Sequence, residues 1–328
     1  MFEVRSRITP VVVTAVLALC ACDGGGNGGL EIQDPGVVEG LVFFDANGNR
    51  TPDAADSPLA NVGIRLLARA TSDTVARTQT DANGLFQLRR VPVGTYDLAV
   101  APATIGDTVK VVGIDPAPVV VQPAESVVAT IAISFERFSV AEARALPAGS
   151  RVFVEGTALN SIETFGDRSI HLAGASAAIR VTRMTTDLVF AGDRIRVRGA
   201  IAIQDGQPTI DETVAFMLSV AGVPQPALVT TSEASTAGGG SLDAALVRVS
   251  AAVIADTLTV VEGFQMEVDD GSGPLQVLAD QDIPFQNLAS LATGATVDVT
   301  GVLVPIPGAT PESWRLKPRS NADLTLQP

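Results

Sequence analysis

A chain of 328 residues, with 46% hydrophobic but 4% aromatic residues, is long enough for two or three domains. Its formal net charge of −14 disfavours broad binding to polyanions, because like charges repel, and restricts such binding to a local basic patch. Thirty glycines and twenty prolines are spread through a chain rich in β-branched residues, which is typical of all-β modules.

The chain begins with a candidate export signal over residues 1–21. Its apolar run is shorter than the roughly 20 apolar residues that a membrane-spanning helix needs. A small residue precedes Cys22 and a glycine-rich stretch follows it, so the segment resembles a bacterial lipoprotein signal. That resemblance implies lipidation of Cys22, since the bulky Leu19 precedes Cys20. It also implies a flexible tether over 22–35 that holds the exported body to a membrane, facing the periplasm or the cell surface. Ordinary secretory cleavage without a lipid is the alternative.

The region 36–136 is a series of short strand-like runs with turns between them. The Asn83-Gly84 pair supplies the positive φ angles of a tight turn. Gly40, the polar loop over 45–56 and the segments 80–84 and 91–96 make this region similar to the prealbumin-like β-sandwich modules of bacterial surface proteins, namely the Cna-B and SdrD B-type repeats, and to carboxypeptidase regulatory-like domains. The resemblance implies a rigid spacer or an adhesive stalk.

The polar loop carries oxygen-bearing side chains at its first, third, fifth, seventh, ninth and twelfth positions. They are Asp45, Asn47, Asn49, Thr51, Asp53 and Asp56. This is the ligand spacing of a twelve-residue calcium loop, although Arg50 stands where such loops have glycine. Two interpretations remain open. The loop binds a structural calcium ion, or it is metal-free and its Asn and Asp side chains cap their own backbone. No other cofactor is predicted.

Two related halves follow, over 137–220 and 243–328, with a predicted linker over 221–242 rich in Pro, Ser, Thr and Gly. The matching segments are 151–156, 169–181 and 191–199 in the first half, and 246–251, 264–278 and 293–301 in the second. Each half has about five short strands, enough to close a small barrel. The lead-in over 139–149 and the Gly-Asp segment over 192–199 resemble the OB-fold modules of exported bacterial proteins. The expected fold class is therefore all-β, with a prealbumin-like β-sandwich followed by two small OB-like β-barrels.

Catalytic motifs are missing from the sequence. It has no Ser-His-Asp set, no glycine-rich phosphate loop and no His/Cys cluster. The one histidine, His171, stands on an alternating strand, where we expect a structural role. The chain is predicted not to be an enzyme.

Arginines form one candidate binding surface. Arg194, Arg196 and Arg198 alternate with apolar residues, so a strand would place them on one face, and Arg180 lies in the same half. Barrels that bind single strands use such a basic groove. The sequence predicts a non-catalytic, lipid-anchored cell-envelope protein with a structural, adhesive or ligand-presenting role, whose protein or polysaccharide partner it does not name. The alternative is a protein whose first barrel binds an anionic polymer, either single-stranded nucleic acid or acidic glycan.

Overall fold

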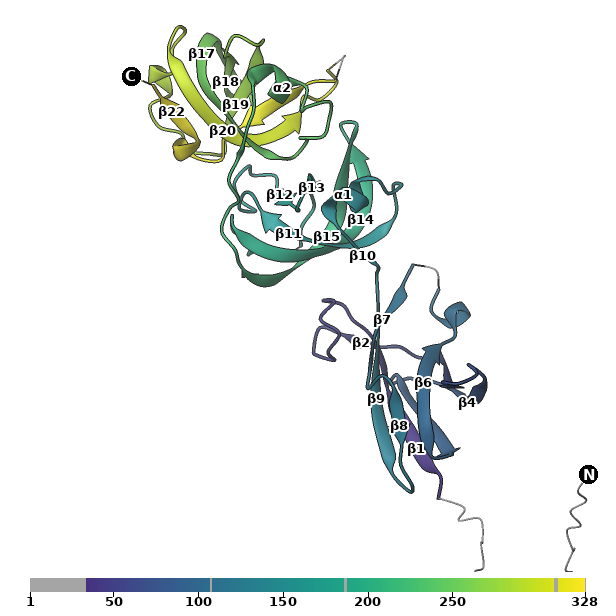
Figure 1. Cartoon of the computed structure of the whole chain (residues 1–328). Coiled ribbons are helices and arrows are strands. Elements are labelled where there is room, and N and C mark those ends of the chain that lie inside the picture. Colours follow the sequence, from purple (N-terminus) through teal and green to yellow (C-terminus); the bar gives the residue numbers. More distant parts are fainter. Residues whose placement is uncertain (1–33, 107, 186–187, 310–311, 328) are drawn as a thin grey trace, which may run out of the picture.

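The computed structural model describes residues 34–328, except 107, 186–187, 310–311 and 328. Three β-modules follow one another along an elongated molecule (Figure 1). The predicted signal and the lipidation site Cys22 lie outside the described residues, as does the tether up to residue 33.

The first module is a sandwich of two sheets. Its strands are β1 (Gly36–Phe44), β2 (Ser57–Pro58), β3 (Gly63–Ala68), β4 (Thr74–Gln79), β5 (Leu85–Val91), β6 (Gly94–Val100), β7 (Lys110–Asp115), β8 (Val119–Val121) and β9 (Ser126–Ser134), with a short 3-10 helix, η1 (Pro102–Thr104). One sheet has the order β2-β1-β9-β7 with β5 also paired to β1, and the other has the order β4-β3-β6-β8. β1 runs parallel to β9.

Alternation along the strands builds the sandwich core. On β1, Val38 and Val42 are fully buried, and they pack with Ile64, Leu66 and Ile131 of neighbouring strands. Apolar residues at every second position on both inner faces are what a two-sheet packing requires.

The second module is a closed five-stranded barrel. Its elements are β10 (Arg137–Phe138), α1 (Val140–Arg144), β11 (Arg151–Ala158), β12 (Ile170–Ala173), β13 (Ala178–Val181), β14 (Asp193–Gln204) and β15 (Gln207–Val220). The sheet runs β10-β11-β12-β13-β15-β14, and β14 pairs back to β11 to close it. The β13–β15 pairing is parallel.

The third module repeats this topology. Its elements are β16 (Ala227–Leu228), α2 (Thr231–Ser235), β17 (Leu246–Val260), β18 (Gly263–Asp269), β19 (Leu275–Asp280), η2 (Leu288–Ser290), β20 (Thr296–Pro305), β21 (Trp314–Lys317), η3 (Asn321–Asp323) and β22 (Leu324–Leu326). The order β16-β17-β18-β19-β21-β20, with β17 paired to β20, matches the first barrel strand for strand, and β22 is an additional strand paired to β20. The predicted fold class, an all-β chain with one sandwich and two small OB-like barrels, is confirmed.

The structure differs from the predicted linker over residues 227–242. β16 pairs with β17, and α2 places Ala234 in the core of the second barrel. The reason is a capping box: the Thr230 side chain accepts from the backbone N–H of Glu233, whose carboxylate accepts from the backbone N–H of Thr230. Ser139 and Glu142 begin α1 in the same way. The connection between the barrels is therefore short, over 221–226.

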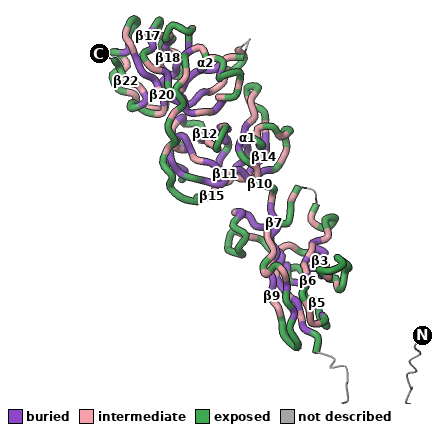
Figure 2. The backbone as a smooth tube through the Cα atoms, viewed as in Figure 1, coloured by how far each residue is buried: buried purple, intermediate pink, exposed green. Residues whose placement is uncertain are grey.

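The two barrels also share a small apolar cluster, separate from their own cores. It joins Leu159, Phe165 and Ala178 of the first barrel to Ala244, Leu246 and Val302 of the second. Figure 2 shows buried residues in all three modules. Each module therefore has a core of its own. Within the described residues, no helix is long and apolar enough to span a membrane.

Candidate functional site

The polar loop after β1 is organised around the buried carboxylate of Asp45. This side chain is fully buried, and it accepts hydrogen bonds from the backbone N–H groups of Asn49 and Arg50, both at 3.0 Å. Asp53 accepts from the side-chain amides of Asn47 at 2.8 Å and Asn49 at 2.7 Å. Asp56 accepts from two backbone N–H groups of the loop.

The electrostatics of the loop follow from these contacts. The backbone N–H of Ala55 and the amides of Asn47 and Asn49 lower the pKa of Asp53. Burial raises the pKa of Asp56, and the negative charges of Asp53 and Asp45 add to this rise. The Asp56 carboxylate is therefore close enough to Asp45 and Asp53 to be repelled by both.

The loop was the predicted calcium site. In this structure its carboxylates are satisfied by N–H donors, and across the described ranges no group of three or more His, Cys, Asp or Glu side chains is placed to hold a metal. A calcium ion would require the Asn47 and Asn49 amides to turn their oxygens inward, since calcium binds oxygen ligands. Calcium binding by Asp45, Asn47, Asn49, Thr51, Asp53 and Asp56 stays a prediction.

The loop presents three consecutive backbone carbonyls to the first barrel. Arg198 donates to the carbonyl oxygen of Ala46 at 3.3 Å, Arg196 to that of Asn47 and Arg137 to that of Gly48. The loop thus makes a direct contact between modules.

Glu155 holds these arginines together on the barrel side. Its carboxylate lies 2.7 Å from Arg196 and 3.5 Å from both Arg137 and Arg194. Partial burial raises the pKa of Glu155, but the hydrogen bond and charge of Arg196, with the charges of Arg137 and Arg194, outweigh it and leave the pKa below its ordinary value.

A row of aromatic rings lies beside this cluster. The four rings are Phe44, Phe135, Phe153 and Phe216, with successive centroids 5.4, 6.1 and 6.4 Å apart. The Arg198 guanidinium lies 5.9 Å from the centroids of both Phe44 and Phe216. We call this contact between the two modules the sandwich–barrel joint. It consists of Glu155, the arginines Arg137, Arg194, Arg196 and Arg198, the backbone carbonyls of residues 46–48 and these four phenylalanine rings.

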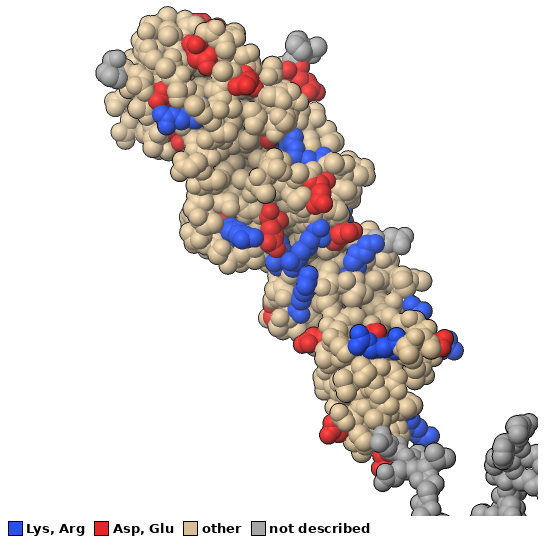
Figure 3. Space-filling model, in the orientation of Figure 1, with Lys and Arg blue, Asp and Glu red and all other residues tan. Residues whose placement is uncertain are grey.

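The structure therefore brings three of the four predicted binding arginines, Arg194, Arg196 and Arg198, close together. They lie at the sandwich–barrel joint. The Arg196 side chain is 10% exposed and that of Arg194 is 55% exposed. Figure 3 shows basic side chains gathered near the junction of the sandwich and the first barrel, with acidic ones between them. Arg180, the fourth, lies elsewhere and pairs with Asp167 at 2.7 Å.

The second junction, between the barrels, is built on Asp243. This buried carboxylate accepts from Nη1 of Arg144, at the end of α1, at 3.0 Å and from the indole N–H of Trp314 at 2.8 Å. Arg319 of the second barrel donates to the carbonyl oxygen of Leu159 in the first, at 2.8 Å.

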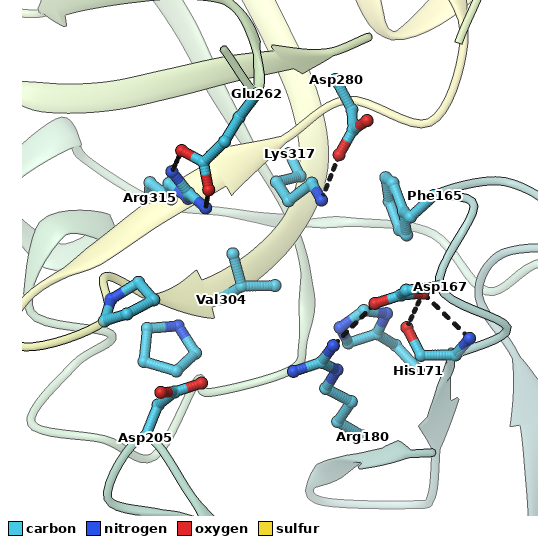
Figure 4. A pocket seen from close by; sticks show the side chains of 13 residues that line it. Phe165, Asp167, His171, Arg180, Asp205, Glu262, Asp280, Val304, Arg315 and Lys317 are labelled. Atoms are coloured by element: carbon cyan, nitrogen blue, oxygen red, sulfur yellow. Dashed lines mark hydrogen bonds and ion pairs between the residues drawn. The ribbon is translucent and has the colours of Figure 1, made fainter. Parts of the chain in front are cut away.

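Between the barrels lies a polar cleft of about 290 Å³, which the sequence did not predict (Figure 4). The Arg180–Asp167 pair and His171 come from the first barrel. The second barrel supplies two more ion pairs. These are Arg315 with Glu262, at 2.9 and 3.1 Å, and Lys317 with Asp280, at 2.5 Å. The cleft is assembled from segments of both barrels that lie far apart in the sequence, between Phe165 and Lys317, so no local spacing signals it.

One comparison with known proteins finds a match in the first module. Residues 37–139 match the family model of the SdrD B-like domain. No curated protein matches the chain.

Similar solved structures include GBS52, the minor pilin of Streptococcus agalactiae. That pilin is 15% identical, with a TM-score of 0.24 over 32% of this chain, and the match spans 46% of the pilin's own length. A murine DNA-binding protein bound with double-stranded DNA is 11% identical, with a TM-score of 0.30, covering 50% of this chain and 90% of that one. A replication protein A heterotrimer bound to single-stranded DNA is 8% identical, with a TM-score of 0.22, covering 60% and 75%. Similarities this low carry no argument about function.

Proposed function

We propose that this chain is a non-catalytic cell-envelope protein whose three modules form a rigid rod, anchored by a lipid on Cys22. The observation that carries the proposal is the sandwich–barrel joint. A sandwich connected by a flexible linker would not need three arginines of the next module bonded to its loop carbonyls.

The position of the first strand supports a particular orientation of the rod, with the sandwich next to the membrane. β1 begins at the end of the sandwich that is remote from the barrels (Figure 1). A tether attached there places the tandem barrels at the far end, away from the membrane. The SdrD B-like match of the first module agrees with a structural role at the cell surface.

Small-angle X-ray scattering of the full-length chain tests the rod. We expect one extended conformation whose scattering is reproduced by a single rigid arrangement of the modules. The double variant Arg137→Ala/Arg196→Ala should broaden the distribution of overall dimensions, because it removes two of the three guanidinium–carbonyl bonds. The control, Arg69→Ala/Arg248→Ala, removes arginines paired within single modules and should leave the scattering unchanged. A broad distribution in the unmodified chain would refute the rod.

Binding of an anionic polymer by the first barrel is the second candidate function, supported by the exposed Arg194 guanidinium. Arg194→Glu is the informative variant, since Arg196 and Arg198 also hold the joint. A binder should show an affinity for single-stranded DNA or heparin that falls as salt increases and that weakens in Arg194→Glu. A chain without affinity at low salt is not such a binder.

A further inference from the structure

The cleft between the barrels has two preformed walls. The shared apolar cluster and the Asp243 contacts hold these walls together on either side of a volume of about 290 Å³. Small-molecule sites measure roughly 300–1,000 Å³, so the cleft suits a small ligand or one residue of a polymer.

One wall carries a fixed hydrogen-bond acceptor, Nε2 of His171. The Asn160 amide nitrogen donates to the carbonyl oxygens of Ser161 and Ser169, which fixes the other amide atom as oxygen. That oxygen lies 3.0 Å from Nδ1 of His171, so Nδ1 carries the proton. Nε2 is left with a lone pair, and it is buried with no partner in the protein.

His171 also stays uncharged. Burial lowers its pKa to about 3, and the positive charge of Arg180 adds to this effect. An unsatisfied buried acceptor destabilises the protein, and a donor group in the cleft would remove that cost.

The opposite wall carries a fixed donor, Nε of Arg315. Both terminal nitrogens of this guanidinium bond to Glu262, while its Nε–H is buried and has no partner in the protein. Arg315 is 8% exposed. The residues that line the cleft therefore carry one unused acceptor and one unused donor, and a hydroxyl group can serve either.

The charges of the lining do not select an anion. The described lining has four acidic side chains, Asp167, Asp205, Glu262 and Asp280, against three basic ones, Arg180, Arg315 and Lys317. The three basic groups are paired with carboxylates of the cleft itself. A neutral molecule with many hydroxyls can bond to both members of each pair without adding a charge to be balanced.

We propose that this cleft binds a neutral sugar residue, whose hydroxyls donate to Nε2 of His171 and to the lining carboxylates and accept from Nε of Arg315. The inference goes beyond the anchored rod and does not depend on it.

The experiment uses the full-length chain, purified in detergent, and a panel of neutral sugars: glucose, galactose, mannose, N-acetylglucosamine and their short oligomers. Saturation-transfer NMR identifies a bound sugar, and calorimetry gives its dissociation constant. Because His171 is the one histidine of the sequence, ¹⁵N-histidine labelling reports on this site alone. We expect the Nε2 signal to shift on sugar addition.

Two variants separate the site from the fold. His171→Phe retains a ring beside Phe165 but removes the acceptor, and Arg315→Lys retains the charge facing Glu262 but removes Nε–H. Each should weaken sugar binding at least tenfold. The matched control is Arg248→Lys, which changes an arginine paired with Asp298 outside the cleft lining and should bind as the unmodified chain does. The proposal is overturned if no neutral sugar shifts the His171 signal, or if both variants bind as tightly as the control.

Discussion

Glu155 and Arg196 face each other on paired strands of the first barrel, 2.7 Å apart, and the same guanidinium reaches the carbonyl oxygen of Asn47 in the sandwich. An ion pair inside one module therefore orients a donor toward the next. In the proposed rod, we expect the stiffness of the junction to depend on this carboxylate, which lies close to three arginines.

Replacement of the carboxylate should loosen the junction. In Glu155→Gln, Arg137, Arg194 and Arg196 lose their common counter-charge, and we expect a loss of about 1.5–3 kcal/mol in the free energy of unfolding. Chemical denaturation measures this. The control is Glu163→Gln, which breaks an exposed pair with Arg168 and should cost less than about 1 kcal/mol. Equal losses in the two variants would contradict the role of Glu155.

The contribution of Glu155 should disappear in acid. Its pKa is lowered in the folded protein, so the stability it provides is present above its ordinary pKa of 4.5 and is lost as the pH falls through the lowered value. The difference in unfolding free energy between the unmodified chain and Glu155→Gln should be constant from pH 5 to 7 and shrink below pH 4. A difference that does not change with pH would exclude this linkage.

Calcium should stabilise the sandwich if the loop around Asp45 binds it. Binding to the folded state adds about 2.7 kcal/mol when the ion is at one hundred times its dissociation constant, so the thermal midpoint should rise with calcium and fall with chelator. Asp53→Ala should abolish the rise, whereas Asp81→Ala, in another turn of the same module, should retain it. A midpoint that does not respond to millimolar calcium would leave the loop as a metal-free, self-capped turn.

Among single substitutions at the contact between the barrels, one at Asp243 should lower the free energy of unfolding most. Asp243→Asn removes the charge that pairs with Arg144, whose side chain is 15% exposed, and breaking such a buried pair costs about 3–5 kcal/mol. Guanidinium unfolding should show this loss. The control is Glu267→Gln, at an exposed residue, which should leave the free energy of unfolding nearly unchanged. A small effect at Asp243 would mean that the shared apolar cluster suffices.

Lipidation should depend on Cys22 and not on Cys20. In a bacterial host that processes lipoproteins, radioactive palmitate should label the unmodified chain and Cys20→Ser but not Cys22→Ser. Cys22→Ser should also leave the membrane fraction. Labelling of Cys22→Ser would contradict the predicted site.

Local patterns predicted the strands and the internal repeat because both depend on alternation and turn residues. The segments over 151–156 and 246–251, matched by sequence, begin β11 and β17. The helix α2 was missed because its five residues lie among glycines and serines, although Thr230 and Glu233 form the same capping box as Ser139 and Glu142.

The roles of single side chains could not be read from those patterns. The alternation of Arg194, Arg196 and Arg198 gives one basic face, but whether solvent, a ligand or a neighbouring module covers that face depends on how modules pack. The cleft between the barrels was even less predictable from the sequence. His171 and Arg315 meet there only because two closed barrels pack together, and neither residue has a distinctive sequence neighbourhood.

The joint binds main-chain oxygens of the sandwich loop, at Ala46, Asn47 and Gly48, and not their side chains. Every amino acid supplies the same carbonyl group, so substitutions at Ala46 and Asn47 that keep the loop conformation preserve the bonds. Gly48 is different, because its positive φ and the nearby Arg137 and Arg196 side chains leave little room for a Cβ. Evolution can therefore change Ala46 and Asn47 while the barrel arginines stay fixed, provided that Asp45 and Gly48 maintain the path of the loop. A different sandwich whose loop follows the same path could be exchanged for this one without redesigning the barrel.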